Sequence, residues 1–180
     1  MDSAFSDEEL EVRKLSEADF PLLETFSCYE KELADFLVED AYSNQAAGIS
    51  VTYLIIEKKG RNLVGYVSVL TDAINLEGEL KAFFGSKDIH YKSLPALKIG
   101  RVAVDDRFQG RGAGTYIINF IINLAHLISE NAGCRFITVD SKRNHDPGKD
   151  PVHFYRKRGF GILKERKKGT IPMYLDLRLK

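Results

Sequence analysis

The chain has 180 residues, of which 44% are hydrophobic and 29% charged, a balance typical of a globular protein with one substantial core. Its 26 Lys and Arg residues equal its 26 Asp and Glu residues, so the zero net charge argues against a wholly basic nucleic-acid-binding surface. The two cysteines lack metal or redox spacing, no apolar run is long enough to span a membrane, and the acidic first residues are unlike a signal peptide. A cytoplasmic protein with no membrane partner is therefore expected.

The first part of the chain predicts a strand, helices and a hairpin. Residues 1–10 are polar and acidic and indicate a loose tail, and the alternation over residues 11–15 predicts a short strand. Apolar residues at helical spacing over residues 20–45 predict two helices. Two β-rich runs flank a short turn with a glycine at residues 59–62, so a hairpin is expected across residues 50–74.

The second part alternates strands with helices. Residues 75–95 contain glycines and a proline with little periodicity, which predicts a long loop with a single helical turn. A strand is expected over 96–104, another over 135–140, a short helix over 152–158, and a closing pair of strands in "FGILKER" and "IPMYLDLRL".

Between these strands, a long apolar helix is expected to follow the glycines at residues 110–114. A narrow polar stripe marks its exposed side, and Gly133 marks its end. The stripe consists of Asn119, Asn123, His126 and Glu130.

This order of elements predicts one α/β domain spanning residues 1–180. An antiparallel opening followed by a β-α-β unit gives a mixed, mostly antiparallel sheet of six to seven strands with helices on both faces. The chain has no internal repeat and no linker that would divide it.

Three alternating glycines stand in "QGRGAG" (residues 109–114), between a β-branched run and the apolar helix. A helix start offers unpaired N–H groups and the positive end of the helix dipole, and glycines there let a phosphate approach the backbone. Arg107 and Arg111 add cations nearby. The competing explanation is a tight strand-to-helix turn with close packing.

Two familiar phosphate-binding patterns fit this stretch poorly. A P-loop needs a Lys followed by Ser or Thr after its glycines, and none follows here. A dinucleotide fold fits Gly110 and Gly112, but Thr115 stands at its third glycine position, so only Asp140 at the end of the following strand keeps that alternative open.

A third pattern, Gln/Arg-x-x-Gly-x-Gly/Ala, is met by Gln109, Gly112 and Gly114, and "FYRKRGF" follows at a fitting distance. With these two motifs, the chain resembles the GNAT superfamily of acetyl-CoA-dependent N-acetyltransferases over essentially its whole length. The resemblance implies a GNAT fold whose sheet is splayed at the middle. Segments such as "GRVAVDDRFQGRGAG" look like the bacterial branch of toxin-type acetyltransferases, whose toxins acetylate the amino acid on charged tRNA, and their free-standing relatives.

The resemblance also implies the site residues. Tyr155 would protonate the departing CoA thiolate, since a phenol with a pKa near 10 is protonated at neutral pH; the alternative is a purely structural core aromatic. Backbone groups of the splayed strand would pair with the pantetheine arm and polarise the acetyl carbonyl. The cofactor-binding residues expected are Val102, Ala103, Val104, Gln109, Gly110, Arg111, Gly112, Ala113, Gly114, Thr115 and Asn144.

No general base and no metal site are expected from the sequence. The strand before the glycines carries no Glu, and Asp105 and Asp106 fit a turn. His90, His126, His145 and His153 show no ligand spacing. The basic run at residues 164–168 fits a solvated surface better than an RNA contact.

The function expected is acetyl-CoA-dependent N-acetyl transfer to a primary amine, by direct attack in a ternary complex. A small-molecule or protein amine ranks first as acceptor. Charged tRNA ranks second, because the neutral net charge gives no long-range attraction for RNA. A non-catalytic CoA- or nucleotide-binding module is the alternative of another class, and a homodimer stays open.

Overall fold

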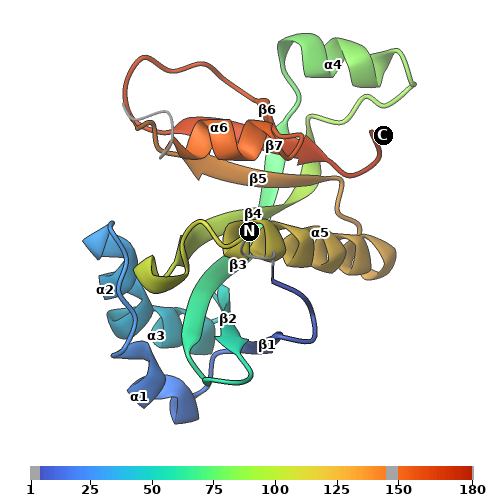
Figure 1. Ribbon diagram of the computed structural model, residues 1–180. Coiled ribbons are helices and arrows are strands. Elements are labelled where there is room, and N and C mark those ends of the chain that lie inside the picture. Colours follow the sequence, from blue (N-terminus) through green and yellow to red (C-terminus); the bar gives the residue numbers. More distant parts are fainter. Residues whose placement is uncertain (1–4, 145–149, 180) are drawn as a thin grey trace. The chain divides into compact units, whose positions relative to one another are not determined.

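The computed structural model describes residues 5–144 and 150–179. Over these residues, seven strands form one mostly antiparallel sheet in the order β1-β2-β3-β4-β5-β7-β6, with helices between them (Figure 1). The α/β class and the mixed sheet expected from the sequence are confirmed. The chain divides into two compact units: unit 1 is Met1–Leu70 with Ile99–Asn123, and unit 2 is Thr71–Lys98 with Leu124–Lys180.

The strands of unit 1 begin with an antiparallel meander. β1 (Leu10–Lys14) pairs with β2 (Val51–Glu57), and β2 pairs with β3 (Leu63–Asn75), whose last residues belong to unit 2. Val51 lies opposite Val69, and the register shifts once near Ile55. The predicted hairpin is therefore confirmed.

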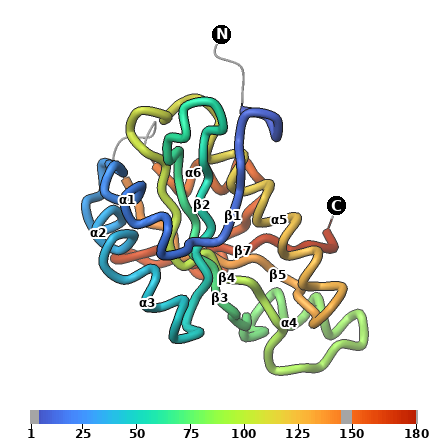
Figure 2. Tube along the Cα trace, turned by 90° about the horizontal axis from the view of Figure 1, so that it is seen from below, coloured from blue at the N-terminus to red at the C-terminus, as the bar shows by residue number. Residues whose placement is uncertain are grey.

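Three α-helices lie within residues 20–46, where two were predicted, and they lie together in Figure 2. A 3-10 turn, η1 (Glu17–Asp19), leads into α1 (Phe20–Leu23), which is followed by α2 (Lys31–Glu39) and α3 (Ala41–Ala46). The helical spacing is interrupted at residues 24–30. The backbone amides of Ser27 and Tyr29 in this segment donate to the side chains of Asp105 and Asp106. The helices bury an apolar cluster against the sheet that includes Leu23, Leu37, Ala41, Leu54 and Tyr66.

Unit 2 contains the helix that the sequence prediction treated as loop. α4 (Gly78–Gly85) occupies the middle of residues 75–95 and precedes β4 (Ser93–Val104), which continues into unit 1. Phe84 is fully buried and packs edge-on against Phe136, with ring centroids 5.8 Å apart. Leu80, Phe83 and Phe84 are spaced as on one helix face, so burial of this face explains why the segment is helical.

The rest of unit 2 follows the predicted order of elements. β5 (Phe136–Ser141) pairs antiparallel with β7 (Ile171–Asp176), and β7 pairs with the two-residue β6 (Gly161–Ile162). α6 (Pro151–Arg156) lies between β5 and β6 in the chain. The closing strand pair is confirmed, although its first strand is shorter than predicted.

The long helix after the glycines is α5 (Ala113–Asn131). Its four predicted polar residues are all exposed, and Gly133 follows it with a φ of +75°, as a glycine that ends a helix does. Leu127 lies outside the polar stripe and was therefore expected to be buried, but 58% of its surface is exposed. No helix among the described residues is both long and apolar enough to cross a membrane.

Candidate cofactor and catalytic site

The turn that joins β4 to α5 carries most of the expected cofactor residues, and it lies within unit 1. β4 ends at Val104, with Ala103 buried and its two valine neighbours half-buried. Asp105 then caps a 3-10 turn, η2 (Asp106–Phe108), and residues 109–112 lead into the helix. The structure therefore brings Val102–Val104 and Gln109–Thr115 together as one strand, turn and helix start.

The alternating glycines serve two different purposes. Gly110 and Gly112 have φ values of +75° and +83°, a region that side chains disfavour, so the turn itself requires glycine there. Gly114 does not have a positive φ and lies in the first turn of α5. A glycine in the first turn of a helix adds no side chain, which is what a phosphate site built from backbone N–H groups would need.

Of the two arginines near this turn, Arg107 is already engaged. Its Nε and Nη2 donate to the fully buried Asp105 carboxylate at 2.7 and 2.9 Å. Burial alone would raise the pKa of Asp105, but hydrogen bonds from Arg107 and from the Ser27 amide outweigh burial and hold that pKa below its ordinary value. Arg107 is therefore a structural partner rather than a cation open to a ligand.

Arg111 is held by aromatic rings instead. The centre of its guanidinium lies 4.9 Å from the ring centroid of Phe5 and 5.4 Å from that of Phe108. Among the described residues, no carboxylate forms an ion pair with Arg111. Its N–H donors are thus open to an anion at the glycine turn.

Asp105 and Asp106 tie this turn to the segment between α1 and α2. Asp105 accepts from the Ser27 amide at 3.1 Å, and Asp106 accepts from the Tyr29 amide at 3.0 Å. Asp106 also accepts from Nε2 of Gln109 at 3.2 Å. Both residues belong to a turn, as expected, but their long-range partners could not be read from the sequence.

The N-terminal turn, residues 5–9, packs on the same region. It is not the loose tail that its polar composition indicated. Asp7 accepts a hydrogen bond from the Tyr116 hydroxyl in the first turns of α5, and burial together with this contact raises the pKa of Tyr116 to about 12. Sequence analysis missed Phe5, and only its apolar side chain in a polar stretch could have indicated a buried contact.

The proposed general acid, Tyr155, lies on α6 in unit 2. Pro151 opens this helix, and Asp150 caps it by accepting from the Val152 amide at 3.1 Å. Tyr155 is only 4% exposed and packs edge-on against Phe154 and Phe160. Burial raises the pKa of its hydroxyl well above the ordinary value, so the phenol is protonated throughout the neutral range.

Asn144 also lies in unit 2, on the segment before α6. Its backbone amide donates to the Asp150 carboxylate at 3.4 Å, so the residue that caps α6 also binds Asn144. Asn144 and Tyr155 thus share one unit, and the glycine turn belongs to the other.

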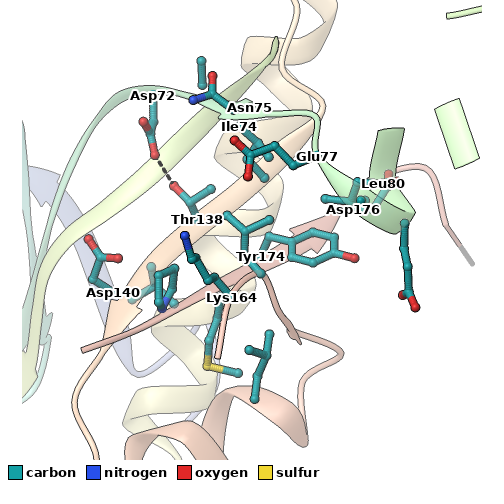
Figure 3. Close-up of a pocket in the computed structure, with 18 of the residues that line it drawn as sticks. Asp72, Ile74, Asn75, Glu77, Leu80, Thr138, Asp140, Lys164, Tyr174 and Asp176 are labelled. Atoms are coloured by element: carbon teal, nitrogen blue, oxygen red, sulfur yellow. Dashed lines mark hydrogen bonds between the residues drawn. The ribbon is translucent and has the colours of Figure 1, made fainter. Parts of the chain in front are cut away.

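Unit 2 also has an open pocket of about 1020 Å³, which the sequence did not predict (Figure 3). α4, the end of β3, Lys98 in β4, β5, β6, β7 and the β6–β7 connection line it. Thr138 donates to Asp72 at 2.7 Å (Figure 3). Lys98 pairs with Asp140 at 2.7 Å. The pocket depends on α4, so a prediction that made residues 75–95 a loop could not contain it.

Among residues 5–144 and 150–179, no three His, Cys, Asp or Glu side chains are grouped as metal ligands would be. His145 lies outside these residues. Both cysteines are free, with Cys134 buried and Cys28 half-buried.

Comparison with protein families identifies the domain. Residues 50–162, more than half of the chain, match the model of the acetyltransferase (GNAT) domain. The chain belongs to the GNAT acetyltransferase family. It is accordingly an N-acetyltransferase that takes its acetyl group from acetyl-CoA.

Solved structures of low sequence identity share the fold. AtaT complexed with acetyl-methionyl-tRNAfMet is 23% identical with a TM-score of 0.75, over 91% of this chain and 94% of that one. AtaTR bound with AcCoA is 23% identical with a TM-score of 0.72, over 92% and 93% of the two chains. A tyrosine-to-phenylalanine mutant of KacT is 20% identical with a TM-score of 0.75, over 91% and 94%.

Proposed function

We propose that this GNAT enzyme transfers acetyl directly from acetyl-CoA to a primary amine in a ternary complex, with Tyr155 as the general acid. The amine nitrogen attacks the thioester carbonyl carbon, the new C–N bond forms and the C–S bond breaks. The thiolate then takes the Tyr155 hydroxyl proton. The attacking nitrogen loses its proton to solvent, and solvent returns a proton to Tyr155. Backbone groups of Val102 and Val104 bind the pantetheine arm and polarise the carbonyl.

The remaining cofactor contacts are proposed on the geometry of each unit. Residues 109–115 surround the CoA pyrophosphate with backbone N–H groups, and Asn144 contacts the cofactor from the segment before α6. Positive φ at Gly110 and Gly112 and the helix start at Ala113 support this assignment.

The observation that carries the role of Tyr155 is a buried phenol on α6 that burial keeps protonated at neutral pH. A protonated hydroxyl can give its proton to a departing thiolate, whereas a deprotonated one cannot.

For the acceptor, the distribution of charge favours the amino group of an aminoacyl-tRNA. Unit 2 contains 17 Lys and Arg against 10 Asp and Glu, whereas unit 1 contains 9 against 16. The zero net charge that counted against RNA therefore conceals a strongly basic unit, which would attract phosphate. The structure of AtaT with acetyl-methionyl-tRNAfMet supports the same acceptor class. A bacterial, cytoplasmic setting is part of this proposal.

The variant Tyr155→Phe tests the proposed acid, because it keeps the ring and its packing. We expect kcat to fall roughly 10- to 1,000-fold, with acetyl-CoA affinity and thermal stability close to those of the wild type. Release of free CoA, measured with total aminoacylated tRNA and with a panel of small amines, gives the rate. Phe154→Leu, which alters the neighbouring ring, is the matched control.

If Tyr155 is only a core residue, Tyr155→Phe will be as active as the wild type and equally stable. Acetyl-CoA binding without CoA release on any acceptor would instead support the non-catalytic module.

A further inference from the structure

Arg111 is held differently from the two arginines of unit 1 that pair with buried carboxylates. Arg13 and Arg107 each donate to a buried carboxylate, Asp19 and Asp105 respectively. Arg111 instead lies against the rings of Phe5 and Phe108, which are themselves in contact, with centroids 6.2 Å apart. An arginine bound by carboxylates has its donors occupied, whereas an arginine bound by rings does not.

This difference matters because of guanidinium geometry. Contact with aromatic rings uses the face of the planar group, and the N–H donors along its edge stay available for a bidentate bond to phosphate. A side chain already held in place also loses less conformational entropy when the ligand binds. Ring contact therefore prepares Arg111 for an anion.

Phe5 is itself anchored, although it lies close to the start of the chain. Within the N-terminal turn, Ser6 donates to the Glu9 carboxylate at 3.0 Å through its amide and its hydroxyl. Lys58 donates from Nζ to the Asp7 carbonyl at 2.7 Å and from its amide to the Glu9 carbonyl at 2.9 Å. With the bond from Tyr116 to Asp7, these contacts fix the turn against β2 and α5.

We infer that the N-terminal turn belongs to the cofactor site and that Phe5 positions Arg111 to bind a phosphate of CoA. The inference rests on the proposed function, because it takes the glycine turn as the CoA phosphate site. Phe5 is a positioning residue: it acts through Arg111 and has no contact with the reacting atoms. The phosphate concerned is either the pyrophosphate or the 3′-phosphate.

The test compares Phe5→Leu, which keeps an apolar side chain, with Phe5→Tyr, which keeps the ring. We expect Phe5→Leu to weaken acetyl-CoA binding about three- to tenfold by calorimetry and to raise KM for acetyl-CoA with kcat unchanged. Turnover of S-acetylpantetheine, a donor without phosphates, should be unaffected, and Phe5→Tyr should restore wild-type affinity. Phe20→Leu, which alters an aromatic pair elsewhere in unit 1, is the matched control.

A double-mutant cycle identifies the route of the effect. If Phe5 acts through Arg111, Phe5→Leu will cause no further loss in an Arg111→Gln background. Repeating the measurement with 3′-dephospho-CoA identifies the phosphate: the loss disappears if Arg111 binds the 3′-phosphate and persists if it binds the pyrophosphate.

Three results would overturn the inference: unchanged acetyl-CoA affinity in Phe5→Leu, an equal loss with S-acetylpantetheine, or tighter acetyl-CoA binding, which would mean that the turn obstructs the site. Calorimetry needs no acceptor, so the two results that concern acetyl-CoA affinity are independent of whether an acetyl acceptor has been found. Failure of the wild-type protein to bind acetyl-CoA would instead contradict the proposed cofactor site.

Discussion

At the scale of single residues, the glycine turn shows that one motif can satisfy two separate demands. Gly110 and Gly112 are needed for backbone conformation, so substitution there strains the turn with or without a ligand. Gly114 has ordinary helical surroundings, and a side chain there meets no such strain. Position 114 is therefore where substitution reports on the ligand rather than on the fold.

We expect Gly114→Asp to abolish measurable acetyl-CoA binding in a protein that still folds. A carboxylate in the first turn of α5 is favourable for the helix, but it repels a pyrophosphate and fills its space. Gly114→Asn has almost the same size without the charge, so it should bind at least tenfold more tightly than Gly114→Asp. Calorimetry with acetyl-CoA and circular dichroism measure the two properties.

Gly114→Ala completes the series, since alanine suits a helix and adds little bulk. Equal affinities for the Asp and Asn variants would contradict electrostatic repulsion. Unchanged affinity in all three variants would show that no phosphate of the cofactor binds at this turn.

The local demands of this turn could be predicted from the sequence, but its distant contacts could not. Alternating glycines after a β-branched run indicate positive φ and a helix start, and both are present. Arg111 and Phe5 are 106 positions apart, and nothing in the acidic segment around Phe5 specifies a ring partner. Such pairs depend on how the chain returns to itself, which periodicity does not encode.

At the scale of elements, Asp105 joins the glycine turn to the segment between α1 and α2. It accepts four hydrogen bonds: from the amides of Ser27 and Arg107 and from two nitrogens of the Arg107 side chain. Asp106 makes a second connection to the same segment by accepting a hydrogen bond from the Tyr29 amide. These bonds explain why residues 24–30 are not helical despite apolar spacing on both sides.

Asp105→Asn should lower the free energy of unfolding by about 1.5–3 kcal/mol, because hydrogen bonds to a buried charge are removed or weakened. Folding lowers the pKa of Asp105, so its charge stabilises the protein above the ordinary Asp range. That contribution is lost as the pH falls through the depressed pKa of the folded state. Urea unfolding at pH 7 and at pH 3 measures both effects.

The variant should differ most from the wild type at pH 7, and the difference should narrow at pH 3. A constant difference at the two pH values would show that the carboxylate charge at Asp105 is not the stabilising feature. Asp35→Asn, which removes an exposed carboxylate on α2, is the control and should change stability by less than about 0.5 kcal/mol.

The elements that the sequence predicted poorly share one property, which is stabilisation from outside the element. α4 has Gly78 and Gly85 at its ends, and these glycines were taken as loop residues rather than as helix boundaries. Its stability depends on Phe84 packing against Phe136, more than 50 positions away. Long helices with their own periodic pattern, such as α5, were predicted well because their signal is local.

At the scale of the whole molecule, charge is divided between the units while the total is zero. Exposed Arg166, Lys167 and Lys168 lie in the connection between β6 and β7, in the basic unit 2. Sequence analysis treated this run as a solvated surface, because it weighed the run against the charge of the entire chain. Counted within unit 2 alone, the run adds to an excess of basic over acidic side chains.

Replacing Arg166, Lys167 and Lys168 together with Gln should raise KM for aminoacyl-tRNA at least about tenfold in 0.15 M salt. The slope of log KM against log salt concentration should fall, by about 0.7–0.9 for each RNA phosphate that the variant no longer neutralises. Turnover of any small amine accepted by the wild type should be unchanged.

A second triple variant, Lys14, Lys31 and Lys59 to Gln, removes the same charge from unit 1 and should leave the RNA reaction nearly unaffected. Equal effects of the two triple variants would show that net charge alone, rather than its location, governs RNA binding. An unchanged KM in the first would favour a small-molecule or protein acceptor.

The path of the chain through the two units limits how such a gene can vary. The chain passes from one unit to the other at Leu70, Lys98 and Asn123, within β3, β4 and α5. No single cut leaves both units whole, so one crossover between related genes always exchanges part of at least one unit. Exchange of the basic unit alone therefore needs a crossover at each of these three positions, and a single crossover cannot transfer it.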